Sequence, residues 1–276
     1  MNNQPLITTI IPTYRRPQLL KRAITSVLNQ TYPNLQVCVY DNASGDETAQ
    51  IVKEISQKDS RVRYYCHSEN IGAIKNLNFG LQQVNTPYFS ILCDDDILLP
   101  NFYEKTLEGF QKYPEAGFVA TQTIFASDKK VLNISCEGYE EKLYRPPEGL
   151  LRTTSLWWIA WMGILFRKEV IDKVGLLDEQ IGDLCDGEFE LRISSVFPYA
   201  VIKSPGAIFY HNKLSWSSNW SAVEPLEGFK IILEKIKNNK DIPLSVREIV
   251  YQNIERYVIR EIWRGGINDL TKKRYN

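Results

Sequence analysis

Residues 6–41 have the sequence LITTIIPTYRRPQLLKRAITSVLNQTYPNLQVCVYD, and this stretch decides the fold class. Residues 6–11 are a continuous apolar, β-branched run, which is typical of a strand buried on both faces and which ends at Pro12. From residue 17 to 28 the apolar side chains recur at helical spacing, and residues 35–40 form a second apolar run. A strand, a helix and a strand this close together predict parallel strands with a right-handed crossover.

The same alternation continues to residue 125. We expect strands at 62–66, 88–93 and 117–125, and helices at 47–55, 73–84 and 101–113. The pattern predicts an α/β protein with a doubly wound, mostly parallel sheet. Because ligands on such sheets bind beyond the carboxyl ends of the strands, the residues that follow each strand are candidates for a site.

Acidic side chains follow two of the predicted strands. Asp41 comes after the strand at 35–40, and Asp94, Asp95 and Asp96 come after the strand at 88–93. Adjacent carboxylates at the end of a buried strand repel one another unless a cation neutralises them. Hard oxygen ligands suit Mg²⁺ or Mn²⁺, which usually share their coordination with substrate phosphates. The sequence therefore predicts a metal-phosphate site, and a solvated acidic turn is the alternative.

Composition narrows the class of protein. The 276 residues suffice for one large domain or a domain with a smaller appendage, and the 33 basic residues balance the 33 acidic ones. The net charge is therefore zero and does not favour binding to nucleic acid or to an anionic membrane. Five widely spaced cysteines without a CxxC pair argue against a disulfide framework or a zinc site. Without a signal-peptide pattern or a run of roughly 18 apolar residues, we expect a soluble cytoplasmic protein.

The second half of the chain has a less regular pattern. Glycine and proline indicate loops between 127 and 156, and Trp157, Trp158 and Trp161 follow as core residues or as the lining of a sugar-binding cleft. The remaining elements that we expect are strands at 164–166, 200–203 and 207–210, and helices at 168–174, 188–196, 226–237 and 244–263. The last helix is interpreted as a packing or dimer helix, with a membrane-surface helix as the alternative.

Several motifs together resemble family 2 glycosyltransferases. They are residues 10–16 (IIPTYRR), 30–33 (QTYP), 39–48 (VYDNASGDET), 70–72 (NIG) with Asn76, Asn78 and Gly80, and the aspartate run with 97–100 (ILLP). The resemblance covers about residues 6–215 in the family's order. It implies the GT-A fold, in which residues 1–125 form a Rossmann-like nucleotide-binding half and 126–220 an acceptor and catalytic half, followed by a helical extension at 221–276.

The resemblance also implies which residues hold the donor. They are Pro12, Thr13, Tyr14, Arg16, Asp41, Asn70, Lys75, Asp94 and Gly163. A carboxylate can accept the N–H of a uracil or thymine base, and a tyrosine can stack on it. Asp94 is expected near the ribose and Asp95 on the metal, while Cys93 replaces the family's first aspartate and leaves Asp96 as a further metal ligand. Lys75 would meet the diphosphate or be a solvated helix lysine.

The catalytic candidate lies in residues 186–192, which resemble the family's Glu-Asp-x-Asp-x-x-x-Arg stretch with Cys185 in place of the glutamate. Asp186 takes the position of the general base, which removes the proton of the acceptor hydroxyl, and a helix N-cap is the plain alternative. Glu188 is the alternative base and, with the three tryptophans, a candidate acceptor contact. His211 is either a metal or diphosphate ligand or structural. Gly163 would keep a loop clear of the donor sugar.

The implied activity is inverting transfer of one sugar from a nucleoside diphosphate sugar, with UDP expected, to a hydroxyl of a glycan or another acceptor, with Mn²⁺ or Mg²⁺. The alternatives are a catalytically silent nucleotide- or glycan-binding module and a sugar nucleotidyltransferase. An NAD enzyme would need GxGxxG after the first strand. By analogy with the family we expect a role in bacterial surface-polysaccharide or glycan synthesis on a lipid- or protein-linked acceptor, with peripheral binding at the inner face of the plasma membrane and a homodimer as options.

Overall fold

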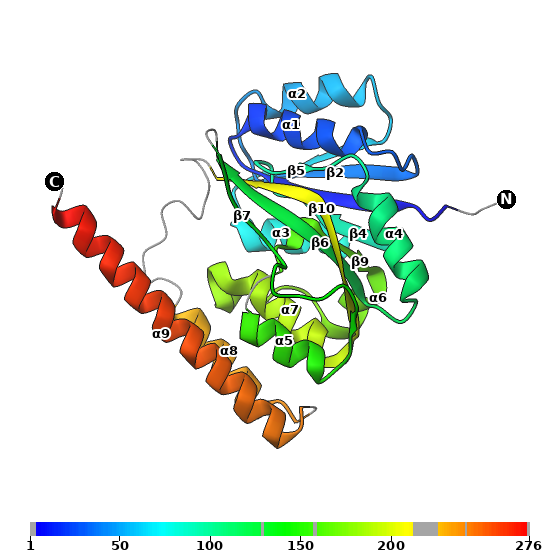
Figure 1. Cartoon of the computed structure of the whole chain (residues 1–276). Helices are drawn as coiled ribbons and strands as arrows, with labels where there is room; N and C mark the ends of the chain where they lie inside the picture. The colour runs from blue at the N-terminus through cyan, green and yellow to red at the C-terminus, as the bar shows by residue number, and fades with distance from the viewer. Residues whose placement is uncertain (1–3, 128–129, 157–158, 212–225, 241, 275–276) are drawn as a thin grey trace.

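The structure is a computed structural model that describes residues 4–127, 130–156, 159–211, 226–240 and 242–274, with side chains up to residue 260. Its centre is a single sheet in the strand order β3-β2-β1-β4-β9-β6-β10-β5 (Figure 1). Helices cover both faces of this sheet, so the domain has three layers. The predicted α/β class is therefore confirmed.

The first half alternates strands and helices as predicted. The elements are β1 (Ile7–Thr13), α1 (Pro17–Leu28), β2 (Leu35–Asp41), α2 (Thr48–Ser56), β3 (Val62–Cys66), α3 (Ala73–Gln82) and β4 (Tyr88–Ile91). All pairings among these four strands are parallel, with Ile7 opposite Leu35 on one side and Tyr88 on the other. The order reverses at β1, because β2 and β3 lie on one side of it and β4 on the other. This is the point at which α/β sheets bind ligands.

The sequence predicted that Pro12 ends the first strand. In the structure Pro12 lies within β1 and ends only the pairing of β1 with β4. β1 continues beside β2 to Thr13, whereas its last bond to the β4 side is from Leu92 N to Ile10 O, 3.0 Å. In a parallel ladder the next bond on that side would need an N–H at residue 12, which proline lacks. The two strands therefore separate at their carboxyl ends.

The second half of the sheet is mixed. Its elements are β5 (Ile97–Leu98), α4 (Phe102–Lys112), β6 (Phe118–Ser127), β7 (Lys130–Ile134), β8 (Leu143–Tyr144), α5 (Glu148–Leu156), η1 (Trp161–Gly163), β9 (Ile164–Arg167), α6 (Lys168–Val174), η2 (Glu179–Leu184), α7 (Cys185–Val196) and β10 (Tyr199–Tyr210). β9 runs antiparallel to both β4 and β6, and β10 runs parallel to β6. The strictly parallel pattern thus holds only for the first four strands.

Two expectations for this half were wrong in detail. The two late strands predicted at 200–203 and 207–210 are one strand, β10, whose register against β6 shifts around Pro205. The stretch from 127 to 156, predicted as loops, contains β7, β8 and α5. β8 pairs with the distant β10, whereas β7 is a short, exposed strand that pairs with β6, the strand before it, so local periodicity carries little information about either.

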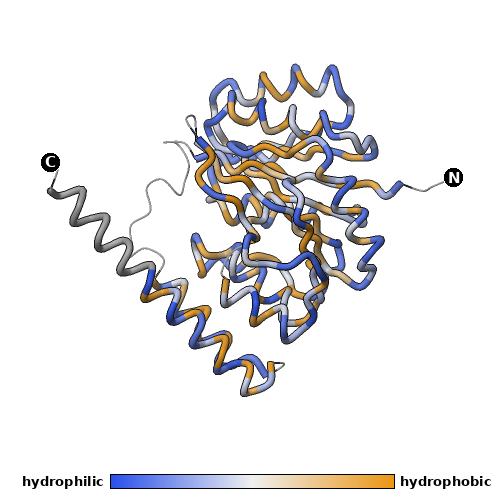
Figure 2. The backbone as a smooth tube through the Cα atoms, in the orientation of Figure 1, coloured by the Kyte–Doolittle hydropathy of each residue, from blue (hydrophilic) through white to orange (hydrophobic). Residues whose placement is uncertain are grey.

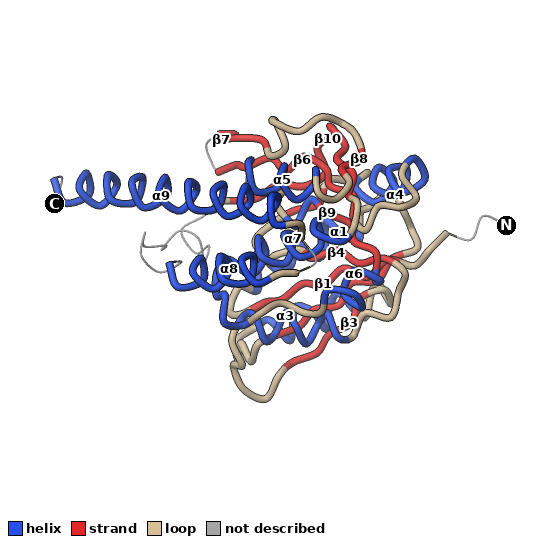
Figure 3. Tube along the Cα trace, turned by 90° about the horizontal axis from the view of Figure 1, so that it is seen from below, coloured by secondary structure: helices blue, strands red, loops and turns tan. Residues whose placement is uncertain are grey.

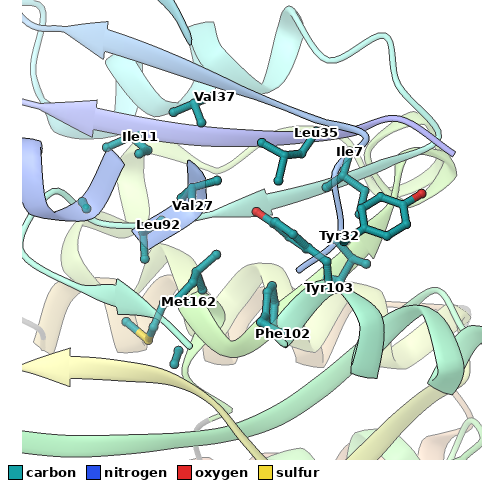
Figure 4. Close-up of a cluster of buried hydrophobic side chains, with 14 of the residues drawn as sticks. Ile7, Ile11, Val27, Tyr32, Leu35, Val37, Leu92, Phe102, Tyr103 and Met162 are labelled. Carbon is teal, nitrogen blue, oxygen red and sulfur yellow. The ribbon is translucent and has the colours of Figure 1, made fainter. Parts of the chain in front are cut away.

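The alternation of side chains along β1 builds two cores. Ile7 and Ile11 face the layer of α1, α2 and α4, where they pack with Val27, Phe102 and Leu92 (Figure 4). Ile10 faces the opposite layer of α3, α6 and α7. A central strand buried on both faces has this composition, and each fully buried aliphatic side chain contributes about 1.5–3 kcal/mol to folding.

The C-terminal helices α8 (Leu226–Asn238) and α9 (Leu244–Arg274) pack together and against the lower layer (Figures 1 and 3). Their apolar side chains form a third core with η2, α5 and α7. Hydrophobic and hydrophilic residues alternate along the coloured part of both helices (Figure 2). α9 is longer than the predicted helix at 244–263. Within the residues that the structure describes, no helix has the length and apolarity that a membrane crossing requires.

Candidate functional site

The loop after β1 meets the end of β4 at the point where the strand order reverses. Thr13 Oγ1 donates a hydrogen bond of 2.8 Å to Asp94 Oδ2. Arg16 Nη1 lies 3.0 Å from Asp94 Oδ1 and 3.3 Å from Asp95 Oδ2. The structure therefore brings together four of the residues that the sequence predicted, Thr13, Arg16, Asp94 and Asp95, in one cluster.

A second loop, which follows β2, fixes the shape of the first. Arg15 has a φ of 56°, and its backbone N–H donates to Ser44 Oγ at 2.8 Å. Ser44 donates in turn to Asp41 Oδ1 through its N–H, 2.9 Å, and its hydroxyl, 2.6 Å. These bonds orient Tyr14, whose ring is 38% exposed and carries the Arg15 guanidinium 5.0 Å from its centroid. Tyr14 is thus exposed in the loop after β1, next to Thr13.

The Asp41 carboxylate is buried and accepts hydrogen bonds from other residues of the protein. Its second carboxylate oxygen, Oδ2, accepts a hydrogen bond of 2.6 Å from Tyr64 OH on β3, and the residue is only 1% exposed. Burial and the neighbouring carboxylate raise the pKa of Tyr64, so the phenol remains a donor. The carboxylate therefore locks the turn at residues 41–45 to β3.

Two of the predicted donor-binding residues lie farther along this edge. Asn70 Oδ1 accepts from Asn42 Nδ2 and from the backbone N–H of Gly72, both at 2.9 Å, and so fixes the loop before α3. Lys75 is well exposed and its Nζ lies 3.9 Å from Glu179 Oε2. Neither side chain contacts the Asp94 cluster.

The three adjacent aspartates have three different environments. Asp95 accepts Arg16 at its carboxylate, and its backbone carbonyl accepts Arg22 Nη2 at 2.6 Å. Asp96 Oδ1 accepts the backbone N–H of Tyr210 at 2.9 Å, whereas none of the described residues hydrogen-bonds its buried Oδ2. Burial raises the pKa of Asp94 to about 6, against the charge of Arg16 and the hydrogen bond from Thr13. Burial and the two neighbouring carboxylates also raise the pKa of Asp96, well above its usual value.

These carboxylates fit a divalent cation that shares phosphate oxygens. In the part of the chain that the structure describes, no three His, Cys, Asp or Glu side chains form a protein-only metal cage. Mg²⁺ and Mn²⁺ need no such cage, since one or two carboxylates and substrate phosphates usually suffice. The unpartnered Oδ2 of Asp96 and the Arg16 guanidinium held by Asp94 and Asp95 both indicate a place that favours positive charge.

His211 follows the residue that bonds Asp96. Its backbone N–H donates to Ala126 O at 2.7 Å, and its exposed ring lies 6.5 Å, centroid to centroid, from Phe209. The backbone thus brings His211 to the same edge as the aspartates, but its ring makes no contact with them.

Asp186 stands apart from this cluster, in the first turn of α7. Its Oδ1 accepts the N–H of Gly187 at 2.7 Å, and the side chain is half-buried. Burial raises its pKa to about 6 against the effect of these backbone N–H groups. Among the described residues no cation pairs with it, so its charge is uncompensated when it ionises.

Two further acids on α7 are more deeply buried than Asp186. Glu190, one turn beyond, is 3% exposed and accepts the Ile159 N–H at 3.4 Å, and burial raises its pKa strongly. Glu188 is 2% exposed, and its carboxylate binds Arg192 and Lys235. The structure therefore places the predicted alternative base inside an ion cluster.

Of the three predicted tryptophans, the structure places Trp161 beside the aspartate run, where it contacts the Cys93 thiol. Trp157 and Trp158 lie outside the described residues. Gly163 is buried against β6, and an added Cβ would come within 2.6 Å of Thr123 Oγ1, so packing alone accounts for the glycine there.

Sequence reasoning missed Ser44, Tyr64, Glu190 and Lys235. Ser44 lies within a quoted motif, so its position after Asp41 was a usable signal for an Asx-type turn. Glu190 lies within the quoted stretch at 186–192, but it meets the Ile159 N–H only in the folded chain. Tyr64 and Lys235 also meet their partners only in the folded chain, and no local pattern identifies them.

The family model described as Glycosyl transferase family 2 matches residues 8–175, which is more than half of the chain. The chain belongs to glycosyltransferase family 2. The match includes the whole cluster around Asp94 and the turn at Asp41. α7 with Asp186 lies beyond its end.

A curated relative of this family 2 chain is the GalNAc(5)-diNAcBac-PP-undecaprenol beta-1,3-glucosyltransferase of Campylobacter jejuni. The two are 33% identical over 111 residues, which cover 38% of this chain and 36% of the relative. The first curated relatives are matched over only 35% to 42% of their own length.

Two solved structures share the fold. S. aureus TarS in complex with UDP-GlcNAc has a TM-score of 0.73 at 16% identity, covering 91% of this chain and 72% of TarS. The mannosyltransferase PcManGT of Pyrobaculum calidifontis, in complex with GDP-Man and Mn²⁺, has a TM-score of 0.63 at 19% identity, covering 93% and 70%. The predicted GT-A fold is confirmed.

Proposed function

We propose that this family 2 glycosyltransferase moves one sugar from a UDP-sugar to a hydroxyl of a glycan or another acceptor, with inversion at the anomeric carbon. The observation that carries the proposal is the convergence of Thr13 and Arg16 on Asp94 and Asp95 at the switch point of the sheet. A nucleoside diphosphate needs this combination of a cationic group, hydroxyl donors and metal-binding carboxylates at the carboxyl ends of parallel strands.

The nucleoside would lie over the loops after β1 and β2. Tyr14 is exposed there for stacking, and Asp41 acts by holding the turn at 41–45 rigid against Tyr64. The UDP-GlcNAc complex of TarS supports a uridine nucleotide as donor. Asn70 and Lys75 would shape the outer edge of the same binding site.

Asp95 and Asp96 would hold Mn²⁺ or Mg²⁺, with His211 on the adjacent strand end as a further ligand and Asp94 toward the ribose. The ion would stabilise the negative charge that develops on the leaving diphosphate. Arg16 is placed to exchange its present carboxylate partners for phosphate oxygens. The Mn²⁺ bound by PcManGT supports this choice of metal.

Asp186 would act as the general base. An ionised carboxylate without a competing cation can take the proton of the acceptor hydroxyl while the oxygen attacks the anomeric carbon on the face opposite the diphosphate. Glu188 is less suited, because two cations already bind its oxygens. Trp161 and the neighbouring tryptophans would line the acceptor side.

The acceptor class remains a proposal as well. The name of the Campylobacter jejuni relative describes transfer of glucose to a glycan linked to undecaprenol diphosphate, which supports a lipid-linked glycan acceptor in bacterial surface-glycan synthesis. The division of the chain also stays a prediction, with a GT-A unit at 1–220, halves at 1–125 and 126–220, and a helical extension at 221–276. We further predict a cytoplasmic location, with peripheral membrane binding and a dimer through the C-terminal helices as options.

Nucleotide binding tests the proposal. The full-length protein is heated with UDP, GDP or dTDP, each with and without Mn²⁺, and the melting temperature is recorded. We expect stabilisation by UDP that requires Mn²⁺, since a ligand at 100 times its Kd adds about 2.7 kcal/mol to the free energy of unfolding. Stabilisation by none of the nucleotides would contradict the proposal. Release of UDP from UDP-sugars and the anomeric configuration of the product then test transfer and inversion.

A further inference from the structure

An ion cluster joins the catalytic helix α7 to the C-terminal extension. Glu188 Oε1 accepts Lys235 Nζ of α8 at 2.8 Å and Arg192 Nε at 2.9 Å, and its Oε2 accepts Arg192 at 2.9 Å. Lys235 Nζ also lies 2.6 Å from Asp178 Oδ2. The cluster therefore contains two carboxylates, Asp178 and Glu188, and two cations, Arg192 and Lys235. Of these four residues, only Lys235 belongs to the extension.

The cluster is buried at its centre. The Glu188 side chain is 3% exposed, whereas those of Lys235 and Asp178 are 38% and 27% exposed. A carboxylate buried to this degree must keep its cations, because an uncompensated buried charge is strongly unfavourable. The positions of Lys235 and Glu188 are therefore tied to each other.

The other two members anchor the cluster to neighbouring segments. Arg192 Nη2 donates to Leu176 O at 2.8 Å, and Nη1 donates to Val174 O at the end of α6. Asp178 accepts the N–H of Gln180 at 2.9 Å and so caps η2. Through these contacts α6, η2, α7 and α8 meet at Glu188, two residues after Asp186.

Close backbone packing of α8 supports the ion pair independently. Gly228 packs against η2 so tightly that an added Cβ would lie 2.3 Å from Ile181 O. Phe229 and Ile232 of α8 pack in one core with Ile181, Leu184 and Leu191. α8 is therefore seated on the segment that leads into the first turn of α7.

We propose that Lys235 is a positioning residue for Asp186, which makes the C-terminal extension a part of the catalytic unit. This inference rests on the proposed role of Asp186 as base. Lys235 holds Glu188, and Glu188 sets the position of the first turn of α7 relative to η2. Since a displacement of about 1 Å at a reacting group can cost roughly 100-fold in rate, a loosened first turn lowers turnover without touching the donor.

The test compares two lysines of the same helix in the full-length protein. In Lys235→Met the aliphatic stem remains and the charge is lost, and we expect kcat to fall by about 10- to 100-fold, with the Kd for UDP and Mn²⁺ unchanged. Lys235→Arg should recover most of kcat, because it restores a cation beside Glu188 and Asp178. The control is Lys230→Met. Lys230 is exposed and, among the described residues, pairs with exposed Glu227 at 2.8 Å, so its loss should leave kcat unchanged.

Several outcomes would overturn the inference. These are wild-type kcat in Lys235→Met, an equal loss in Lys230→Met, or a loss of UDP binding that parallels the loss of kcat. If Lys235→Met does not fold, Glu188→Gln provides the same comparison, since it keeps the side-chain shape and removes the charge that Lys235 compensates. The proposed function fails separately, if Asp186→Asn keeps wild-type transfer or if no nucleotide binds.

Discussion

Asp94 and Asp186 are a buried and a half-buried carboxyl group whose pKa values are both raised to about 6, and they differ in their partners. At Asp94 the cost of burial is opposed by the Arg16 guanidinium and by Thr13, and Asp95 lies next to it. At Asp186 only backbone N–H groups of its own helix oppose burial. Similar pKa values therefore arise in Asp94, which already has a cationic partner, and in Asp186, which has none among the described residues. This difference in partners suits Asp94 to the donor and metal site and Asp186 to the role of a base.

The largest expected effect separates the two sites by activity. Asp186→Asn should lower kcat by about 100- to 10,000-fold, the usual contribution of a general base, while Mn²⁺-dependent UDP binding is retained. Turnover of UDP-sugar and the Kd for UDP are the two measurements. Asp172→Asn is the matched control, because this aspartate is exposed on α6 and pairs only with Lys168. A variant that keeps wild-type kcat would remove the distinction between the two sites.

The next largest effect is on nucleotide binding and concerns the metal site. Asp95→Asn removes one of the carboxylates proposed to bind the metal, so we expect Mn²⁺-dependent UDP binding to weaken by about 10- to 100-fold, on the scale of losses at metal sites. Titration calorimetry with UDP at fixed Mn²⁺ measures this, with Asp186→Asn as the control that binds normally. Equal UDP affinity in both variants would show that Asp95 does not hold the ion.

The smallest effect is graded and depends on pH. Burial raises the pKa of Asp186 from 3.8 to about 6, so the base is protonated and inactive below that pH. At saturating donor and Mn²⁺, kcat should fall about tenfold for each pH unit below 6. The same shift means that the folded state binds this proton more tightly than the unfolded chain, so the contribution of Asp186 to stability is lost as the pH rises through 6. A kcat that stays constant down to pH 5 at unchanged melting temperature would contradict the assignment.

Sequence reasoning succeeded where structure is local. The run at residues 6–11 and the helical spacing after Pro17 predicted β1 and α1, and the positions of Asp41 and Asp94 after strands predicted that both lie at one edge of the sheet. It failed for a short exposed strand and where pairing is distant. β7 is short and exposed beside β6, β8 depends on the distant β10, and the two apolar runs in 200–210 are one strand because β6 pairs with both.

The candidate site likewise contains contacts that the sequence predicted and contacts that it did not. Thr13 and Asp94 meet because topology places two strand ends side by side, and this was predictable from the alternation of elements. Which donors hold Asp41, and which cations hold Glu188, depends on Tyr64 and Lys235, 23 and 47 residues away along the chain. The pKa of Asp186 depends on burial, which a sequence pattern does not measure.

Pro12 has a consequence for what can join the two segments beyond the ladder. Neighbouring parallel strands tend to continue pairing through their backbones. The imide nitrogen of Pro12 cannot supply the next hydrogen bond beyond Leu92, so the end of the β1–β4 ladder is a property of the covalent chain. Beyond this point the contact between the two segments is left to side chains, such as Thr13 and Asp94.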